Sequence, residues 1–184
     1  MHGSPAPTAP AQDPAPVQDL PPLSDHDFRQ YNRLAVEMEY YHNHFREAWS
    51  TMATACANSR LPKTMTQRQF LNIGLRFTGH LAGHHAIEEA HLFPALARRM
   101  PEFSKKNQGL LVRQHKAIHR GLDALEGYLH KCLEGSESLD LQKLAGLMEW
   151  GDTLFEHLDE EVRLIGAENM RRYWTKEEIM RIRM

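Results

Sequence analysis

Residues 83–96 read GHHAIEEAHLFPAL, a stretch that combines three histidines and two glutamates with the apolar spacing of a buried helix. Leu92 and Leu96 continue the three-and-four spacing of the leucines before the stretch, and His85 and Glu89 lie in the same phase. A helix that keeps its phase while it exchanges leucine for histidine and glutamate buries polar groups that need a partner. The stretch therefore predicts a core helix with a polar site inside the core.

Three further segments have the same helical period, one before this helix and two after it. Their core-phase positions are Leu34, Met38, Tyr41, Phe45, Trp49 and Met52, then Leu111, His115, Ile118, Leu122, Leu125 and Leu129, then Leu147, Trp150, Leu154, His157, Glu161 and Leu164. No run alternates with period 2 for long enough to predict a strand. Four long helices with short links predict an all-α fold, an antiparallel four-helix bundle.

Capping residues and composition divide the chain into three segments. Seven of the ten prolines fall in residues 1–24, which predicts a disordered Pro/Ala-rich tail. We expect the bundle to span 25–170, followed by a C-terminal helical segment at 171–184 with Trp174 docked on the bundle. The expected helix caps are Ser24, the capping pairs Thr66/Gln69 and Thr175/Glu178, and Ser104 for the third long helix. We also expect Pro94 to bend the second helix.

The core-phase polar residues form a candidate metal site. They are His42, His85, Glu89, His115, His119, His157 and Glu161, three pairs of which have the i, i+4 spacing that stacks side chains on one helix face. A single histidine of this kind is more often a core residue bonded to a carbonyl. Five imidazoles and two carboxylates in one core would carry a prohibitive desolvation cost unless a bound group compensates them. Metal ions coordinated by these side chains would do so.

The number of ligands favours two iron ions. Zinc is normally four-coordinate and prefers thiolates in structural sites, whereas imidazole mixed with carboxylate suits iron among the first-row metals. With about six positions per ion, five histidines, two bridging carboxylates and one bridging oxo or hydroxo oxygen fill about eleven of about twelve positions. The remaining position would admit dioxygen or a related small molecule.

The same residues carry a resemblance to a known family. MEYYHN (38–43), HHAIEEAHLFP (84–94), QHKAIHRGLDALEGYL (114–129) and HLDEEVRLI (157–165) resemble the hemerythrin-like, or HHE cation-binding, domain, and most of all its fungal members. The resemblance covers about residues 28–168 and implies a non-haem di-iron bundle. On the second helix the HxxxE motif fits either of two adjacent residue pairs. We choose His85 with Glu89, because Leu92 and Phe93 follow Glu89 as Leu164 and Ile165 follow Glu161, and we keep His84 with Glu88 as the alternative.

Fold and metal do not decide the activity. We expect a di-iron protein that binds dioxygen reversibly. The alternatives are an oxidase or oxygenase acting on a small organic substrate, with a cavity near Tyr173 and Trp174, and an iron-storage or stress protein. A carboxylate-rich ferritin-like site is the competing di-iron type, with matches at Glu39/His42 and Glu88/His91 on neighbouring helices only.

The composition restricts the classes of partner and the cellular location that we expect for the chain. The net charge of -2 provides no basic field, so neither nucleic acid nor an anionic membrane is an expected partner. No apolar run approaches the roughly 20 residues of a membrane-spanning helix. The two cysteines, Cys56 and Cys132, are far apart, and no secretory signal is evident, which predicts a reduced, cytoplasmic chain. Nothing in the sequence indicates the oligomeric state.

Overall fold

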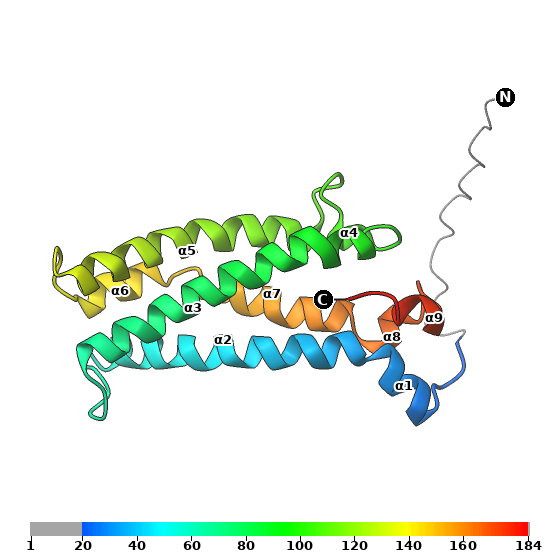
Figure 1. Cartoon of the computed structure of the whole chain (residues 1–184), viewed down its shortest axis with the longest axis horizontal. Coiled ribbons are helices and arrows are strands. Elements are labelled where there is room, and N and C mark those ends of the chain that lie inside the picture. Colours follow the sequence, from blue (N-terminus) through cyan, green and yellow to red (C-terminus); the bar gives the residue numbers. More distant parts are fainter. Residues whose placement is uncertain (1–19, 184) are drawn as a thin grey trace.

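The computed structural model describes residues 20–183, so residues 1–19 of the predicted tail lie outside the described part of the chain. Within 20–183 the regular structure is helical, and the described chain contains no strand, which confirms the all-α class. The long helices are α2 (Arg33–Ala57), α3 (Gln67–Ile87), α5 (Leu110–Glu134) and α7 (Gly151–Leu164). They lie side by side and alternate in direction, as the antiparallel bundle requires (Figure 1).

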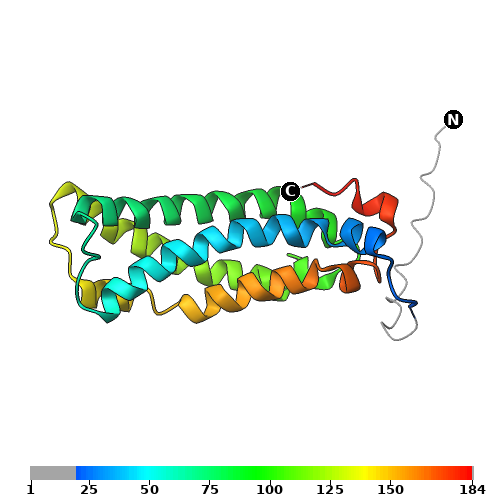
Figure 2. The same cartoon turned by 90° about the horizontal axis from the view of Figure 1, so that it is seen from below.

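Short elements close the two ends of the bundle. The helix α1 (Asp25–Tyr31) packs on α8 (Ala167–Met170) and α9 (Lys176–Ile179), and these three gather at one end (Figure 2). The helix α3 continues through a π-helical turn, η2 (Glu88–Leu92), into α4 (Phe93–Leu96), and a 3-10 turn, η3 (Pro101–Phe103), precedes α5. The opposite end carries α6 (Leu141–Leu147).

Most of the expected caps are confirmed. The side chain of Ser24 accepts a hydrogen bond from the Asp27 amide, and both capping boxes, Thr66/Gln69 and Thr175/Glu178, are formed in both directions. Trp174 is buried against the bundle, as expected.

The expected cap at Ser104 is wrong. The third long helix, α5, begins at Leu110 with Gly109 as its N-cap, and Ser104 instead accepts a hydrogen bond from the Asn107 amide in the preceding turn. The glycine is required there because a Cβ at Gly109 would lie 2.2 Å from the carbonyl oxygen of Glu102. A close backbone approach therefore fixes the start of the helix.

The fourth helical segment is interrupted between α6 and α7, where the sequence predicted a continuous stripe. Trp150 stands at the interruption, and its indole N–H donates to the Leu147 carbonyl at the end of α6. Its ring packs edge-on against Trp49, and a Cβ at Gly121 would lie only 2.4 Å from it. The break accommodates two tryptophan rings between the helices, because Gly121 leaves space for Trp150 and Gly151 leaves space for Trp49.

The interior of the bundle has three layers along its length. One apolar cluster lies toward the α6 end, and we call it the loop-end cluster; it includes Phe45, Trp49, Phe77, Ile118, Leu125 and Leu154. The other lies toward the chain ends, the terminus-end cluster, and includes Leu34, Met38, Leu92, Phe93, Leu111 and Leu164. Between them, at positions 42, 85, 88, 115, 157 and 161, the buried residues are histidine and glutamate. We call this the histidine–glutamate layer.

Candidate metal centre

The histidine–glutamate layer draws on all the long helices. Its fully or almost fully buried members are His42 on α2, His85 and Glu88 at the α3–η2 junction, His115 on α5, and His157 and Glu161 on α7, each at most 2% exposed. His84 borders them with a side chain 12% exposed. Each sits where its helix would otherwise place an apolar residue, so the packing that buries the two clusters also buries the layer.

Two groups of possible ligand atoms overlap in this layer. In the first, one atom from each of His85, Glu88, His115 and His157 lies within 4.8 Å of the others. In the second, the same holds for His42, His84, Glu88 and Glu161. Glu88 belongs to both groups. A carboxylate shared between two adjacent sets of imidazoles has the connectivity of a ligand that bridges two ions.

Many buried polar atoms of the layer and of His84 lack hydrogen-bond partners among the described residues. These atoms are Nε2 of His42, His84 and His115, both ring nitrogens of His85 and His157, and both carboxylate oxygens of Glu88 and Glu161. His84 Nε2 lies only 2.8 Å from Glu88 Oε1, yet the pair is not aligned as a hydrogen bond. Buried polar atoms without partners are costly and rare in proteins. A set that converges on a common space fits metal ions with nitrogen and oxygen ligands.

Two histidines of the layer are oriented by their outer ring nitrogens. His42 Nδ1 lies 3.1 Å from the Leu158 carbonyl oxygen, and His115 Nδ1 lies 3.0 Å from Glu89 Oε1. An Nδ1–H that donates outward fixes the tautomer in which Nε2 is the free lone pair, which is the usual arrangement of metal-binding histidine. Both rings therefore present Nε2 to the interior.

Burial favours the neutral form of four histidines in and beside the layer, His84, His85, His115 and His157. It lowers the pKa of His84 and of His157 to about 4, with the neighbouring His42 adding to the effect and the Glu161 charge opposing it. Burial and the adjacent histidines also hold the pKa of His85 and His115 far below the usual range. Neutral imidazole is the form that binds a metal.

The two buried carboxylates differ in their preferred charge. Burial, together with the charge of Glu161, raises the pKa of Glu88 well above its usual range. Burial also acts to raise the pKa of Glu161, but its contacts with His42 and His157 outweigh this and lower it. Two adjacent carboxylates in an apolar setting cannot both ionise at low cost. Cations in the layer would remove that conflict.

Two predicted ligands lie at the rim of the layer. The side chain of Glu89 is 34% exposed, and it contacts Lys105 Nζ at 3.2 Å as well as His115. His119 is 36% exposed, and its Nε2 is 3.8 Å from Glu89 Oε1. Together with His115 these residues form a third group of neighbouring ligand atoms, contributed by η2 and α5. The structure places the other five predicted residues inside the layer.

Glu88, which the sequence offered only as the alternative, occupies the central place. The choice of Glu89 rested on its spacing to Leu92 and Phe93, but the π turn η2 places one extra residue there, and the Phe93 amide bonds to the Glu88 carbonyl five residues back. The spacing from glutamate to the next core leucine is therefore one residue longer on α3 than on α7.

The helical phase before the turn carried the better signal. At about 100° per residue, Glu88 lies about 20° from the direction of the buried Leu81, and Glu89 about 80° from it. Measured from Leu81, the phase thus points to Glu88.

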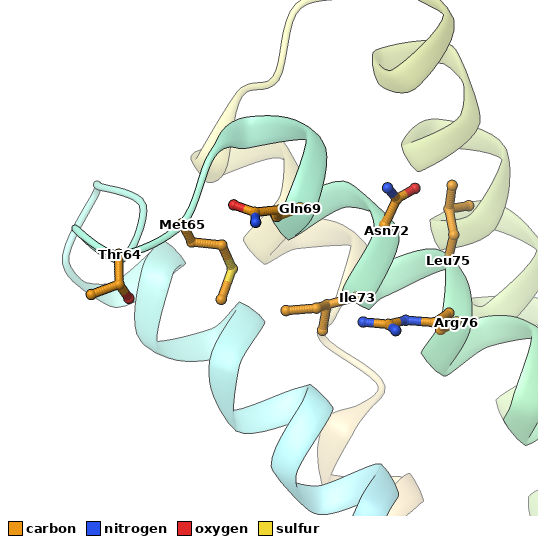
Figure 3. Close-up of a pocket in the computed structure, with 7 residues that line it drawn as sticks. All are labelled: Thr64, Met65, Gln69, Asn72, Ile73, Leu75 and Arg76. Atoms are coloured by element: carbon orange, nitrogen blue, oxygen red, sulfur yellow. The ribbon is translucent and has the colours of Figure 1, made fainter.

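The hollows of the described surface differ in their relation to the layer. A hollow of about 670 Å³ near the start of α3, lined by residues such as Met65, Gln69 and Arg76, is remote from the layer and offers no histidine or carboxylate (Figure 3). The hollow beside Trp174, where the sequence led us to expect a cavity, is lined by His91, Arg99 and Glu178 and includes no layer residue. A third, of about 570 Å³ between α2 and α3, reaches His84.

Comparison with known proteins identifies a family. The model described as hemerythrin HHE cation binding domain matches residues 33–167, which span all the long helices and every residue of the layer. The match defines the family without distinguishing its fungal members. Comparisons with curated proteins and with solved structures gave no match. None of the helices within residues 20–183 is long and apolar enough to span a bilayer.

Proposed function

The chain belongs to the hemerythrin HHE cation-binding family, and on that premise we propose that its histidine–glutamate layer holds two iron ions and binds dioxygen. The observation that carries the proposal is the pair of overlapping ligand groups that share Glu88. Iron held by imidazole and carboxylate supplies redox chemistry and a position that a small diatomic molecule can occupy. The nitrogens and oxygens without partners support this occupancy, because no side chain of the described chain satisfies them.

We assign the ligands by these groups. One ion would be held by His42 and His84, the other by His85, His115 and His157, with Glu88 as the bridging carboxylate and Glu161 beside the first ion. Glu161 Oε2 lies 3.5 Å from His42 Nε2 and 3.7 Å from His157 Nε2, so it also faces both sets. We place Glu89 and His119 at the rim, where Glu89 orients His115 through Nδ1.

The apolar clusters on both sides of the layer determine which kind of ligand the layer favours. Leu92 and Phe93 lie on one side and Ile118 and Leu158 on the other, all at most 1% exposed. These two apolar sides limit the access of bulk water, which favours a small neutral ligand such as dioxygen over an anion.

Oxidation of a small organic molecule is the second candidate function. The observation that favours it is the groove between α2 and α3, which reaches His84 and is large enough for an organic molecule. A protein that only binds dioxygen has no need of such a groove beside its metal ligand.

Anaerobic loading with ferrous iron tests the proposal. The wild-type protein should bind two irons per chain, and on exposure to air it should develop a visible absorption band that disappears when dioxygen is removed. A band that decays irreversibly would favour oxidation. The matched variants Glu88→Gln and Glu89→Gln decide the ligand assignment. Glu88→Gln should lose one or both irons, and Glu89→Gln should keep both with roughly 10–100-fold weaker affinity.

Two results would contradict the proposal. Fewer than two irons in the wild-type protein would exclude the di-iron centre. Complete loss of iron in Glu89→Gln together with full retention in Glu88→Gln would show that the bridging carboxylate is Glu89.

A further inference from the structure

The groove between α2 and α3 is open because of two glycines on its α3 side. Gly79 and Gly83 are exposed and four residues apart, so they follow one another on the same helix face. A Cβ built at either position would meet nothing within 4 Å. These glycines are therefore not there to let the helices approach closely. They leave the wall of the groove without side chains, at a cost of about 1 kcal/mol each in helix stability relative to alanine.

The opposite wall and the rim are aromatic and apolar. Tyr40, Tyr41 and Ile87 are 63%, 43% and 52% exposed and all line the groove, together with the buried Phe45. Three large exposed side chains in one hollow are a feature of ligand sites more than of ordinary surface. A flat apolar ring would cover them.

His84 connects the groove to the layer. Its ring lies among Phe45, Tyr41 and His42, with centroid distances of 5.2, 5.6 and 5.5 Å. Its Nε2 lies 2.8 Å from Glu88 Oε1 without forming a hydrogen bond, and its Nδ1 also makes no hydrogen bond to the described residues. With Nε2 bound to a metal, Nδ1 carries the proton and needs an acceptor.

The other oriented histidines obtain that acceptor from the protein. Leu158 supplies a carbonyl to His42, and Glu89 supplies a carboxylate to His115. His84, like His85 and His157, has no such acceptor among the described residues; because His84 also lines the groove, its acceptor can be a molecule in the groove, either water or a ligand.

Charge and hydrogen bonding in the groove define the acceptor. Among the described residues that line it, Glu37 is the only Asp, Glu, Lys or Arg, and it pairs with Arg33 at 3.6 Å, so no lysine or arginine lines the groove to hold an anion. His44 Nδ1 lies 2.7 Å from the Tyr40 carbonyl oxygen, so it donates there, and His44 Nε2 is left as an acceptor. A neutral hydroxyl on an aromatic ring matches both needs, since it accepts from His84 and donates to a second group.

We propose that this groove binds a neutral phenol, with its ring against Tyr41 and Ile87 and its oxygen at Nδ1 of His84. The proposal deepens the function proposed above and rests on it in one respect, the commitment of His84 Nε2 to a metal. If the protein oxidises a small organic molecule, the phenol is the class of substrate. If the protein carries dioxygen, the phenol is a second ligand that alters the properties of the metal through its hydrogen bond with His84.

Binding of 4-methylphenol, measured by calorimetry on metal-free and on anaerobic ferrous protein, tests the inference. Toluene, which lacks the hydroxyl, and 4-methylbenzoate, which is an anion, should bind at least tenfold more weakly to the ferrous protein. Gly83→Leu fills the groove and should weaken 4-methylphenol binding at least tenfold. The matched control is Gly127→Leu, an exposed glycine on α5 whose Cβ also meets nothing within 4 Å, and its affinity should be unchanged.

A second readout follows the hydrogen bond to His84. Saturation with 4-methylphenol should shift the visible spectrum of the air-exposed iron protein, and should not do so in Gly83→Leu. Equal affinity of wild type and Gly83→Leu, or equal affinity for toluene and 4-methylphenol, would overturn the site. Binding without a spectral shift would overturn the contact with His84. If 4-methylphenol binds the metal-free protein but two irons never load, the proposed function fails while the groove stands.

Discussion

The histidine–glutamate layer and the loop-end cluster are built by the same helices and are equally buried, yet different forces hold them. His42 and Phe45 are one turn apart on α2, as are His115 and Ile118 on α5. In the loop-end cluster burial is itself stabilising, by about 1.5–3 kcal/mol for a large apolar side chain. In the layer the same burial strands ring nitrogens and carboxylate oxygens without partners, which opposes folding. The apolar clusters therefore drive folding and offset the cost of burying the layer, whose polar atoms would be satisfied by bound metal ions.

The largest expected effect on stability comes from a substitution in the loop-end cluster, and a substitution in the layer should affect metal binding instead. Leu125 is fully buried in the loop-end cluster, and Leu125→Ala should lower the free energy of unfolding by about 2–5 kcal/mol with the metal content unchanged. His157→Leu should abolish full metal loading while leaving the metal-free protein at least as stable as wild type. Denaturant unfolding and metal analysis measure both. If His157→Leu destabilised the metal-free protein as much as Leu125→Ala, the layer would be self-stabilised and the comparison would fail.

Acid should lower the stability of the metal-free protein through the histidines of the layer, and not through the apolar side chains of the loop-end cluster. The unfolded chain takes up protons on its histidines below about pH 6.5, whereas His84 and His157 in the folded protein have a pKa of about 4. Between these values the unfolded state binds more protons, so the stability of the metal-free protein falls as the pH falls.

Glu88 opposes this trend, because the folded state already holds its proton. The histidines outnumber it, and we expect a net loss on the order of 3 kcal/mol between pH 7 and pH 5. Unfolding titrations at both pH values measure it, with His157→Leu as the control that should show a smaller loss. A loss of the same size in both proteins would assign the pH dependence to groups outside the layer.

The smallest effect probes the packing of the loop-end cluster. A Cβ at Gly121 would lie 2.4 Å from the Trp150 ring, so Gly121→Ala should destabilise by about 1–3 kcal/mol. On the same helix, Gly127→Ala meets nothing and should stabilise by about 0.5–1 kcal/mol. Thermal unfolding compares the two. Equal effects of both substitutions would mean that Trp150 yields freely and that this cluster is loosely packed.

The helices and the existence of a polar layer follow from local rules. The three-and-four spacing of apolar residues identified every long helix, and the capping boxes at Thr66 and Thr175 identified the starts of two helices. These signals work at short range because a helix turns by a fixed angle per residue, and because a capping side chain reaches only two or three residues along the chain. The break at Trp150 and the start of α5 at Gly109 had no such local signal, since contacts with distant backbone and rings impose them.

The sequence by itself determined that imidazoles and carboxylates would face one core, because each replaces an apolar residue in helical phase. The phase measured from Leu81 favoured Glu88 over Glu89, but only the tertiary structure decided that Glu88 is shared by both ligand groups. Neighbouring residues on a helix point about 100° apart, and a π turn adds one residue without changing the composition. The directions in which Glu88 and His84 point are therefore fixed by the helices packed around them, and so is the groove that reaches His84.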